Sequence, residues 1–189
     1  MSRFLSDKYR DLTPYTPGEQ PQIKSLIKLN TNECPYPPSP AVLDALTSEQ
    51  ISDLRLYPDP LATSLTESIA EYYGLDAEQI IVGNGSDEIL AFCFMAFQNS
   101  GRRIYYPEIS YGFYPVYANV FGAKGNAVPL DENLHIKIED YKNLDGTIVI
   151  ANPNAPTGIA LEPEEIEEIL KTNKDNPVKI GRASCRERV

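Results

Sequence analysis

Basic residues are scarce in this chain, and their scarcity excludes two classes of partner. Among 189 residues, 17 are lysine or arginine and 27 are aspartate or glutamate, so the formal net charge is −10. Nucleic acids and anionic membranes attract basic surfaces. We therefore expect neither a nucleic acid nor a membrane as the main partner.

The chain also has no long apolar run, no even set of cysteines and only one histidine. A membrane-spanning helix needs about 20 apolar residues, and the longest mostly apolar stretch is residues 89–97. The three cysteines are odd in number and widely spaced, and the single histidine, His135, lies in a polar connection typical of a solvent-facing loop. These features predict neither a disulfide framework nor a metal site. We expect a globular protein of the cytoplasm.

What the chain does contain is a regular alternation of apolar runs and amphipathic segments. The runs indicate strands at residues 79–82, 103–106, 126–130 and 147–151. Helical patterns begin at the Ser39-Pro40 and Asp59-Pro60 pairs and recur at residues 87–98, 111–121 and 163–171. Such alternation predicts an α/β fold with three layers, in which helices cover both faces of a mostly parallel sheet. Ligands bind beyond the carboxyl ends of such strands.

The loop after the first apolar run has the residues of a phosphate-binding turn. Gly83 and Gly85 allow the backbone to approach an anion closely, and the N–H groups of Ser86 and Asp87 would lie at the positive end of the next helix. The run has neither the lysine of a Walker loop nor the third glycine of a dinucleotide fingerprint. By itself it indicates an ordinary tight turn as readily as a phosphate site.

Five motifs in a fixed order give the loops a common interpretation. They are Leu29-Asn-Thr-Asn-Glu33, Tyr57-Pro-Asp-Pro60, Gly83-Asn-Gly-Ser-Asp-Glu88, Tyr111-Gly-Phe-Tyr114 and Asn152-Pro-Asn-Ala-Pro-Thr-Gly158. Over about residues 28–179 the chain resembles the first half of fold-type I pyridoxal-phosphate aminotransferases, and among them most closely the histidinol-phosphate aminotransferase family. The resemblance implies an incomplete large domain of that fold and pyridoxal 5'-phosphate as cofactor.

The resemblance also implies roles for individual residues. Gly85, Ser86 and Asp87 would bind the cofactor phosphate through backbone N–H groups, and Tyr111 would stack on the pyridine ring. Tyr57 would reach the phosphate bound by a neighbouring subunit, which implies a homodimer. Among 12 tyrosines, only Tyr57 and Tyr111 are distinguished in this way; the others are expected to pack ordinarily. Asn32 would line the substrate side.

One motif departs from the family pattern. The family most often has asparagine immediately before Pro-Thr-Gly, where it donates to the 3-hydroxyl of the cofactor, and this chain has Ala155 there. Asn154 is the neighbouring residue that could make the same contact through a shifted loop, with Asn152 or a water molecule as the alternatives. Asn154 is therefore included among the predicted cofactor contacts.

The catalytic groups of such enzymes lie further along the chain than the matching segments. Neither the lysine that binds the cofactor covalently, nor the acid that pairs with the pyridine nitrogen, nor the arginine that binds the substrate carboxylate is present. No catalytic residue is predicted, and the fragment alone is expected to be inactive. We expect an arm at residues 1–29, a partial cofactor-binding domain at residues 30–179 and a non-native, arginine-rich tail at residues 180–189.

The predicted function follows from the resemblance. For the full-length gene it is transamination between L-histidinol phosphate and 2-oxoglutarate in histidine biosynthesis. Two alternatives within the superfamily are a threonine-phosphate decarboxylase and an aromatic aminotransferase, because the arginines that would separate them are absent. An alternative of another class is a non-catalytic protein that has kept only the phosphate-binding turn.

Overall fold

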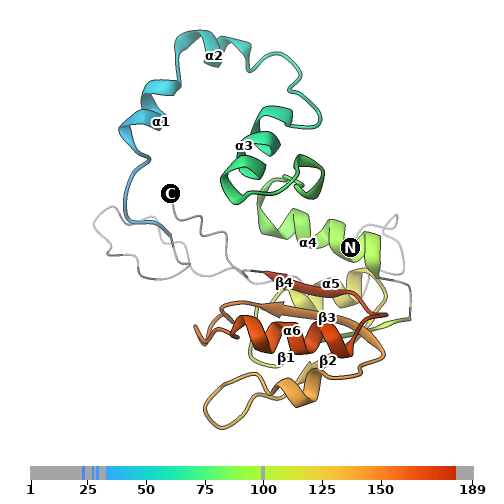
Figure 1. The fold of residues 1–189 in the computed structure, drawn as a ribbon. Helices are drawn as coiled ribbons and strands as arrows, with labels where there is room; N and C mark the ends of the chain where they lie inside the picture. Colours follow the sequence, from blue (N-terminus) through green and yellow to red (C-terminus); the bar gives the residue numbers. More distant parts are fainter. Residues whose placement is uncertain (1–22, 24–26, 28, 30–32, 99–100, 182–189) are drawn as a thin grey trace, which may run out of the picture. The chain divides into compact units, whose positions relative to one another are not determined.

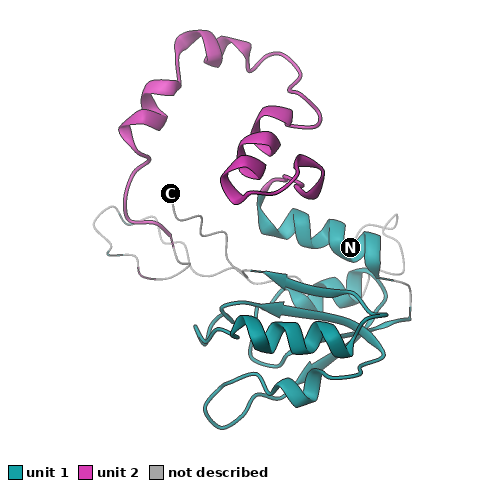
Figure 2. Ribbon diagram, viewed as in Figure 1, with its two compact units in different colours: residues 1–28, 85–189 teal, residues 29–84 magenta. Residues whose placement is uncertain are grey.

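The computed structural model describes residues 23, 27, 29, 33–98 and 101–181. The chain divides into two compact units, one formed by Met1–Lys28 with Gly85–Val189 and the other by Leu29–Asn84 (Figure 2). Most of the predicted arm, the predicted substrate residue Asn32 and residues 182–189 of the predicted tail lie outside the described residues. Each unit is described separately below.

The first unit is built on a parallel sheet of four strands (Figure 1). The strands are β1 (Arg103–Pro107), β2 (Lys124–Val128), β3 (Gly146–Ala151) and β4 (Val178–Gly181), in the spatial order β2-β1-β3-β4. All three neighbouring pairs are parallel. Every residue of β3 is buried, which is typical of a central strand with helices on both faces.

Helices cover both faces of this sheet, which confirms the predicted three layers. In Figure 1, α5 (Tyr114–Val120) lies behind the sheet and α6 (Pro163–Thr172) lies in front of it. One core joins α5 and α4 (Gly85–Phe97) to the sheet and contains Leu90, Phe94, Ile104, Tyr106, Tyr114, Tyr117, Ala118 and Val149. The other core, beneath α6, contains Val128, Ile136, Tyr141, Ile148, Ile150, Leu161 and Ile169.

Polar side chains hold both ends of α6. The helix begins with a capping box between Glu162 and Glu165, with a proline at its first position. At its other end Asn173 is 3% exposed, and its Nδ2 donates to the carbonyl oxygens of Tyr141 at 2.7 Å and Ile169 at 2.8 Å. The backbone N–H of Leu144 donates to Asn173 Oδ1 at 2.9 Å. Asn173 thus connects α6 to the short helix η3 (Ile138–Tyr141).

The second unit consists of short helices: α1 (Pro40–Ala45), α2 (Ser48–Asp53), α3 (Thr63–Tyr73) and the 3-10 turn η2 (Ala77–Gln79). Asp59 prepares the start of α3, because its carboxylate accepts from the N–H groups of Leu61 at 3.0 Å and Thr63 at 2.7 Å. Hydrogen bonds from the Thr63 side chain, and then from these two N–H groups, lower the pKa of Asp59. The predicted helix therefore begins at Thr63, three residues after Pro60.

Two predicted strands differ from the structure. The strand expected at residues 79–82 is wrong: the chain follows η2 with irregular backbone, and Ile81 is 69% exposed. An apolar run becomes a strand only beside a neighbour that accepts and donates its backbone hydrogen bonds, and none of the four described strands pairs with this segment. The strand expected at 126–130 instead spans Lys124–Val128, because pairing with β1 includes two residues that hydropathy does not mark.

Two classes of feature are not found in the described parts of the chain. No helix there is long and apolar enough to cross a membrane. No group of three or more His, Cys, Asp or Glu side chains in the same residues could hold a metal ion. His135 is exposed, as its polar surroundings in the sequence predict.

Candidate cofactor site

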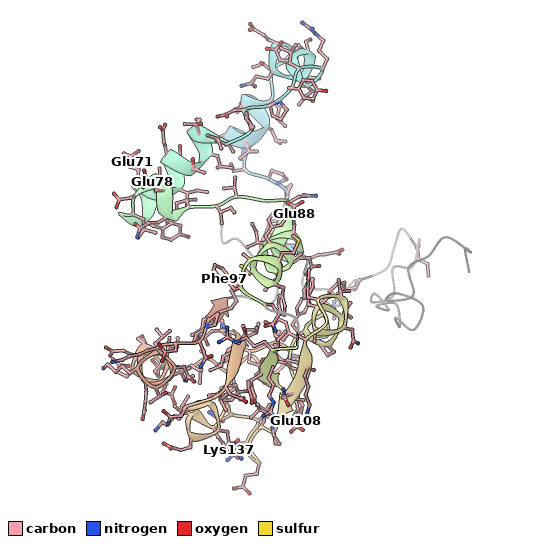
Figure 3. All side chains as sticks on the ribbon, turned by 90° about the vertical axis from the view of Figure 1, so that its right-hand side faces the viewer. Glu71, Glu78, Glu88, Phe97, Glu108 and Lys137 are labelled. Atoms are coloured by element: carbon pink, nitrogen blue, oxygen red, sulfur yellow. The ribbon has the colours of Figure 1, made fainter. Side chains whose placement is uncertain are left out.

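The first turn of α4 forms one side of the candidate site. The helix begins at Gly85, whose φ of +83° lies in the left-handed region that residues with a Cβ rarely adopt. The N–H groups of a first helical turn have no acceptor within the helix, and the helix dipole adds positive potential there. Figure 3 labels Glu88 in this first turn and Phe97 at the last residue of the helix. The helix begins within the turn for which the sequence predicts phosphate binding, although the described residues 80–84 directly before it form no strand.

Tyr111 lies directly beside this helix start. Its hydroxyl donates to Asp87 Oδ1 at 2.6 Å. The ring is held by two aromatic neighbours: Phe113 stacks on it with 6.0 Å between centroids, and Tyr114 meets it edge-on at 5.7 Å. The loop after β1 thus brings a flat ring next to the start of α4, as the sequence predicts for a ring platform and a phosphate-binding turn in one site.

A second tyrosine binds the same helix turn from α5. The Tyr117 hydroxyl donates to the backbone oxygen of Asp87 at 2.7 Å, and its ring stacks on Phe94 with 5.1 Å between centroids. Burial, followed by the nearby charge of Asp87, raises the pKa of Tyr117 well above its usual range. Sequence analysis assigned Tyr117 only to packing. No sequence signal marks it, because the hydroxyl acts on a turn 30 residues away.

The loop after β3 lies against the loop that carries Tyr111. Asn154, at 1% exposure, donates through Nδ2 to the backbone oxygen of Ile109 at 2.9 Å and accepts from Ser110 Oγ at 2.7 Å. The neighbouring Asn152 instead forms two hydrogen bonds with the backbone of Leu161. Both asparagines that sequence analysis considered for the cofactor's 3-hydroxyl are therefore engaged with protein groups.

The remaining predicted residues are not placed in this site. Tyr57 lies in the second unit, between α2 and α3, and its side chain is fully exposed. Asn32 lies outside the described residues. The structure therefore brings together Gly85, Ser86, Asp87, Tyr111 and Asn154 within the first unit and leaves the predicted roles of Tyr57 and Asn32 as predictions.

The donor set suits a ligand with a phosphate group and a flat ring. The start of α4 provides backbone N–H groups in a region of positive potential. Tyr111 provides an aromatic face, and its hydroxyl is hydrogen-bonded to Asp87 in the same helix turn. The loops after β1 and β3 lie at the carboxyl ends of adjacent parallel strands, where ligands of α/β sheets bind. The residues present therefore fit a group such as pyridoxal 5'-phosphate.

Comparison with known proteins gives relatives along nearly the whole chain. A histidinol-phosphate aminotransferase from Brachyspira hyodysenteriae is 57% identical over 183 residues, covering 97% of this chain and 52% of the relative. One from Acinetobacter baumannii is 52% identical over 184 residues, covering 96% of this chain and 51% of the relative. The chain thus spans about half the length of these relatives.

Solved structures agree with the fold. The histidinol-phosphate aminotransferase of Clostridium acetobutylicum is 31% identical, with a TM-score of 0.60 over 70% of this chain and 40% of the other. The enzyme of Sinorhizobium meliloti, solved in complex with pyridoxal-5'-phosphate, is 19% identical, with a TM-score of 0.66 over 76% of this chain and 40% of the other. At that identity it supports the fold alone. The first unit is accordingly an incomplete α/β domain of the aminotransferase fold.

The family assignment rests on a match that is longer than any of the motifs. The family described as aminotransferase class I and II matches residues 24–179, which include the helix start at Gly85, the loop that carries Tyr111 and the loop of residues 152–158. Together with the parallel sheet and the adjacent loops, this match leads to one conclusion: the chain belongs to the family of class I and II aminotransferases.

Proposed function

We propose that this chain is the amino-terminal part of a pyridoxal-phosphate-dependent transaminase that transfers an amino group between L-histidinol phosphate and 2-oxoglutarate. The observation that carries the proposal is the hydrogen bond between Tyr111 and Asp87, because it puts an aromatic face beside a helix start. The names of the relatives at 49–57% identity supply the substrate. The bound cofactor supplies an electron sink for the reacting carbon.

The residues of the first unit hold the cofactor in this proposal. Backbone N–H groups of Gly85, Ser86 and Asp87 bind its phosphate, and the ring of Tyr111 supports the pyridine ring from one side. The Asp87 carboxylate accepts a hydrogen bond from the Tyr111 hydroxyl at 2.6 Å, which fixes the carboxylate beside the Tyr111 ring. For Asn154 the buried contacts support a different role, which is argued in the next subsection.

The second unit enters the proposal through the subunit interface. We propose a homodimer in which Tyr57 reaches the phosphate bound by the partner subunit and Asn32 lines the substrate side. The full exposure of Tyr57 supports this role, since none of the described residues covers its ring. We further propose that the enzyme acts in the cytoplasm as part of histidine biosynthesis.

Exposed apolar groups support the proposal that the large domain is incomplete. The buried residues of α4, Leu90 and Phe94, face the sheet, while Phe92, Met95 and Phe97 are 40%, 57% and 59% exposed. A helix that is apolar on all sides is typical of burial on all sides. We propose that further chain covers this face. The proposed domain spans residues 30–179, flanked by the arm 1–29 and a non-native tail from residue 180, although β4 continues to Gly181.

The first test is the sequence of the source locus beyond codon 181. We expect an in-frame strand that bears an aspartate and, later, a segment that bears the cofactor-binding lysine. A stop codon directly after Val189 would contradict the enzyme and favour the non-catalytic alternative. We refer to the whole product of this locus as the encoded protein.

The second test measures the activity of the encoded protein with its cofactor. We expect glutamate to form from 2-oxoglutarate when L-histidinol phosphate is the amino donor, with a kcat/KM at least ~10-fold higher than for L-phenylalanine. L-Threonine phosphate is assayed in parallel for release of carbon dioxide. Faster turnover of L-threonine phosphate or L-phenylalanine would replace the proposed substrate, and cofactor binding without turnover of any of the three would contradict the transaminase.

A further inference from the structure

We propose that Asn154 is a positioning residue, which fixes the loop carrying Tyr111 (residues 107–112, here the Tyr111 loop) without touching the cofactor. The place of the cofactor rests on the function proposed above, whereas the contacts of Asn154 are those of the chain alone. The proposal assigns to this asparagine a task different from the donation to the 3-hydroxyl that the motif predicts.

The side-chain amide of Asn154 has no hydrogen left for a ligand. An asparagine amide carries two N–H donors and one carbonyl acceptor. The two donors serve the backbone oxygen of Ile109 at 2.9 Å and Thr157 Oγ1 at 3.3 Å, and the acceptor receives Ser110 Oγ at 2.7 Å. At 1% exposure the group lies inside the protein. Donation to a cofactor hydroxyl would require it to give up one of these partners.

The backbone of Asn154 is held just as firmly by its own loop. Its N–H donates to the backbone oxygen of Ile159 at 2.8 Å, and its oxygen accepts from the N–H of Gly158 at 2.7 Å. The Thr157 hydroxyl adds a contact of 3.3 Å to the same oxygen. Asn154 is therefore a fixed point from which the neighbouring loop can be positioned.

Across the two loops, the Asn154 side chain binds the two residues that directly precede Tyr111. Ile109 and Ser110 are bound by Asn154, and Tyr111 in turn donates to Asp87 in the first turn of α4 at 2.6 Å. Breaking the first contacts leaves the carbonyl of Ile109 and the hydroxyl of Ser110 without these buried partners, which is costly. Through this series of contacts Asn154 sets where the Tyr111 ring lies relative to the phosphate-binding turn.

The test compares Asn154→Ala with a matched change two residues away. Asn152→Ala removes an asparagine from the same loop, but its side chain binds Leu161 and not the Tyr111 loop. Amide hydrogen exchange is measured on the encoded protein without cofactor, in peptides that cover residues 107–113. We expect exchange about tenfold faster in Asn154→Ala and unchanged in Asn152→Ala. Wild-type exchange in Asn154→Ala would overturn the proposal, because a group that only touches the cofactor leaves the cofactor-free loop unaffected.

A milder variant keeps the test decisive if Asn154→Ala does not fold. Ser110→Ala removes one hydroxyl from the same contact and is expected to accelerate exchange of the Tyr111 loop in the same direction, by a smaller factor. Where Asn154→Ala does fold, the double variant is expected to show a less than additive effect, because both changes remove the same contact. Additive effects would contradict the shared contact.

Spectroscopy of the loaded protein separates positioning from direct contact. A positioning residue lowers cofactor affinity but leaves the pH midpoint of the cofactor's visible absorption at the wild-type value. A donor to the 3-hydroxyl shifts that midpoint when it is removed, and such a shift would overturn the proposal. If the wild-type protein binds no cofactor, the proposed function fails, whereas the exchange experiment still tests the contacts of Asn154.

Discussion

At two buried tyrosines, Tyr141 and Tyr117, we expect the substitution Tyr→Phe to change the stability of the fold in opposite directions. Tyr141 is fully buried, and its hydroxyl has no hydrogen-bond partner among the described residues. Tyr117 is also buried, at 6% exposure, but its hydroxyl donates to the backbone oxygen of Asp87 at 2.7 Å. Tyr141→Phe therefore removes a buried hydroxyl whose loss of hydration is not offset by a hydrogen bond, whereas Tyr117→Phe breaks a hydrogen bond.

The magnitudes follow from the cost of buried polar groups. An unsatisfied buried hydroxyl costs ~1–3 kcal/mol, and the one-atom void left by Tyr141→Phe offsets part of the relief, so we expect a net stabilisation of about 1 kcal/mol. Tyr117→Phe loses a hydrogen bond worth ~0.5–1.5 kcal/mol and leaves the Asp87 carbonyl without this partner. The two variants should differ by about 2 kcal/mol in the free energy of unfolding, with opposite signs relative to wild type.

Urea unfolding of the cofactor-free encoded protein measures this difference. Cofactor is left out because Tyr117 binds the turn to which we assign the phosphate. In its absence, a change in cofactor affinity cannot contribute to the measured free energy of unfolding. We expect the midpoint to rise for Tyr141→Phe and to fall for Tyr117→Phe, with equal slopes. A fall of the midpoint in Tyr141→Phe would refute the reasoning, because it would show that the buried hydroxyl has a partner that stabilises the fold.

Three further predictions concern backbone strain, alkaline pH and the end of α6. Gly85→Ala is expected to lower the free energy of unfolding by ~1–2 kcal/mol and to weaken cofactor binding. Gly101→Ala, at the same φ of +83°, is expected to strain the backbone without changing cofactor affinity. Equal cofactor affinities in titrations of both variants would contradict the phosphate role. Burial raises the pKa of Tyr114 to about 12, so the folded protein keeps a proton that the unfolded chain loses at lower pH. Stability is therefore expected to fall as pH rises from about 10 to about 12. Thermal midpoints that stay constant over this range would contradict the burial. Asn173→Ala removes three side-chain hydrogen bonds, two of them buried, and is expected to destabilise the protein by ~2–4 kcal/mol. The exposed Asn133→Ala is expected to change little in the same urea assay.

Most of the longer helices and two central strands could be predicted because their signals are local, whereas α2 (Ser48–Asp53) was not predicted. Pro40 and Pro163 each follow a residue with extended backbone and begin a helix, and the apolar run at residues 147–151 lies within the fully buried β3. The strand predicted at residues 79–82 fails because a strand also needs a neighbour, and the sequence of one segment does not tell whether that neighbour is present.

The candidate site was predictable in its backbone and less so in its side chains. Gly85 and Tyr111 belong to motifs, and the structure brings them to one place. The hydroxyl contact of Tyr117 and the buried contacts of Asn154 depend on the approach of segments 30 and 45 residues apart, which no spacing in the sequence indicates. For Asn154, the motif predicts a ligand contact where the structure has a buried amide bound to a neighbouring loop.

The central claim is that the start of α4 and the Tyr111 ring together hold pyridoxal 5'-phosphate. A crystal structure of the encoded protein grown with this cofactor tests it most directly. We expect the phosphate to accept hydrogen bonds from backbone N–H groups of Gly85, Ser86 and Asp87, with the pyridine ring stacked on Tyr111. A phosphate bound elsewhere, or a cofactor ring that does not contact Tyr111, would contradict the account.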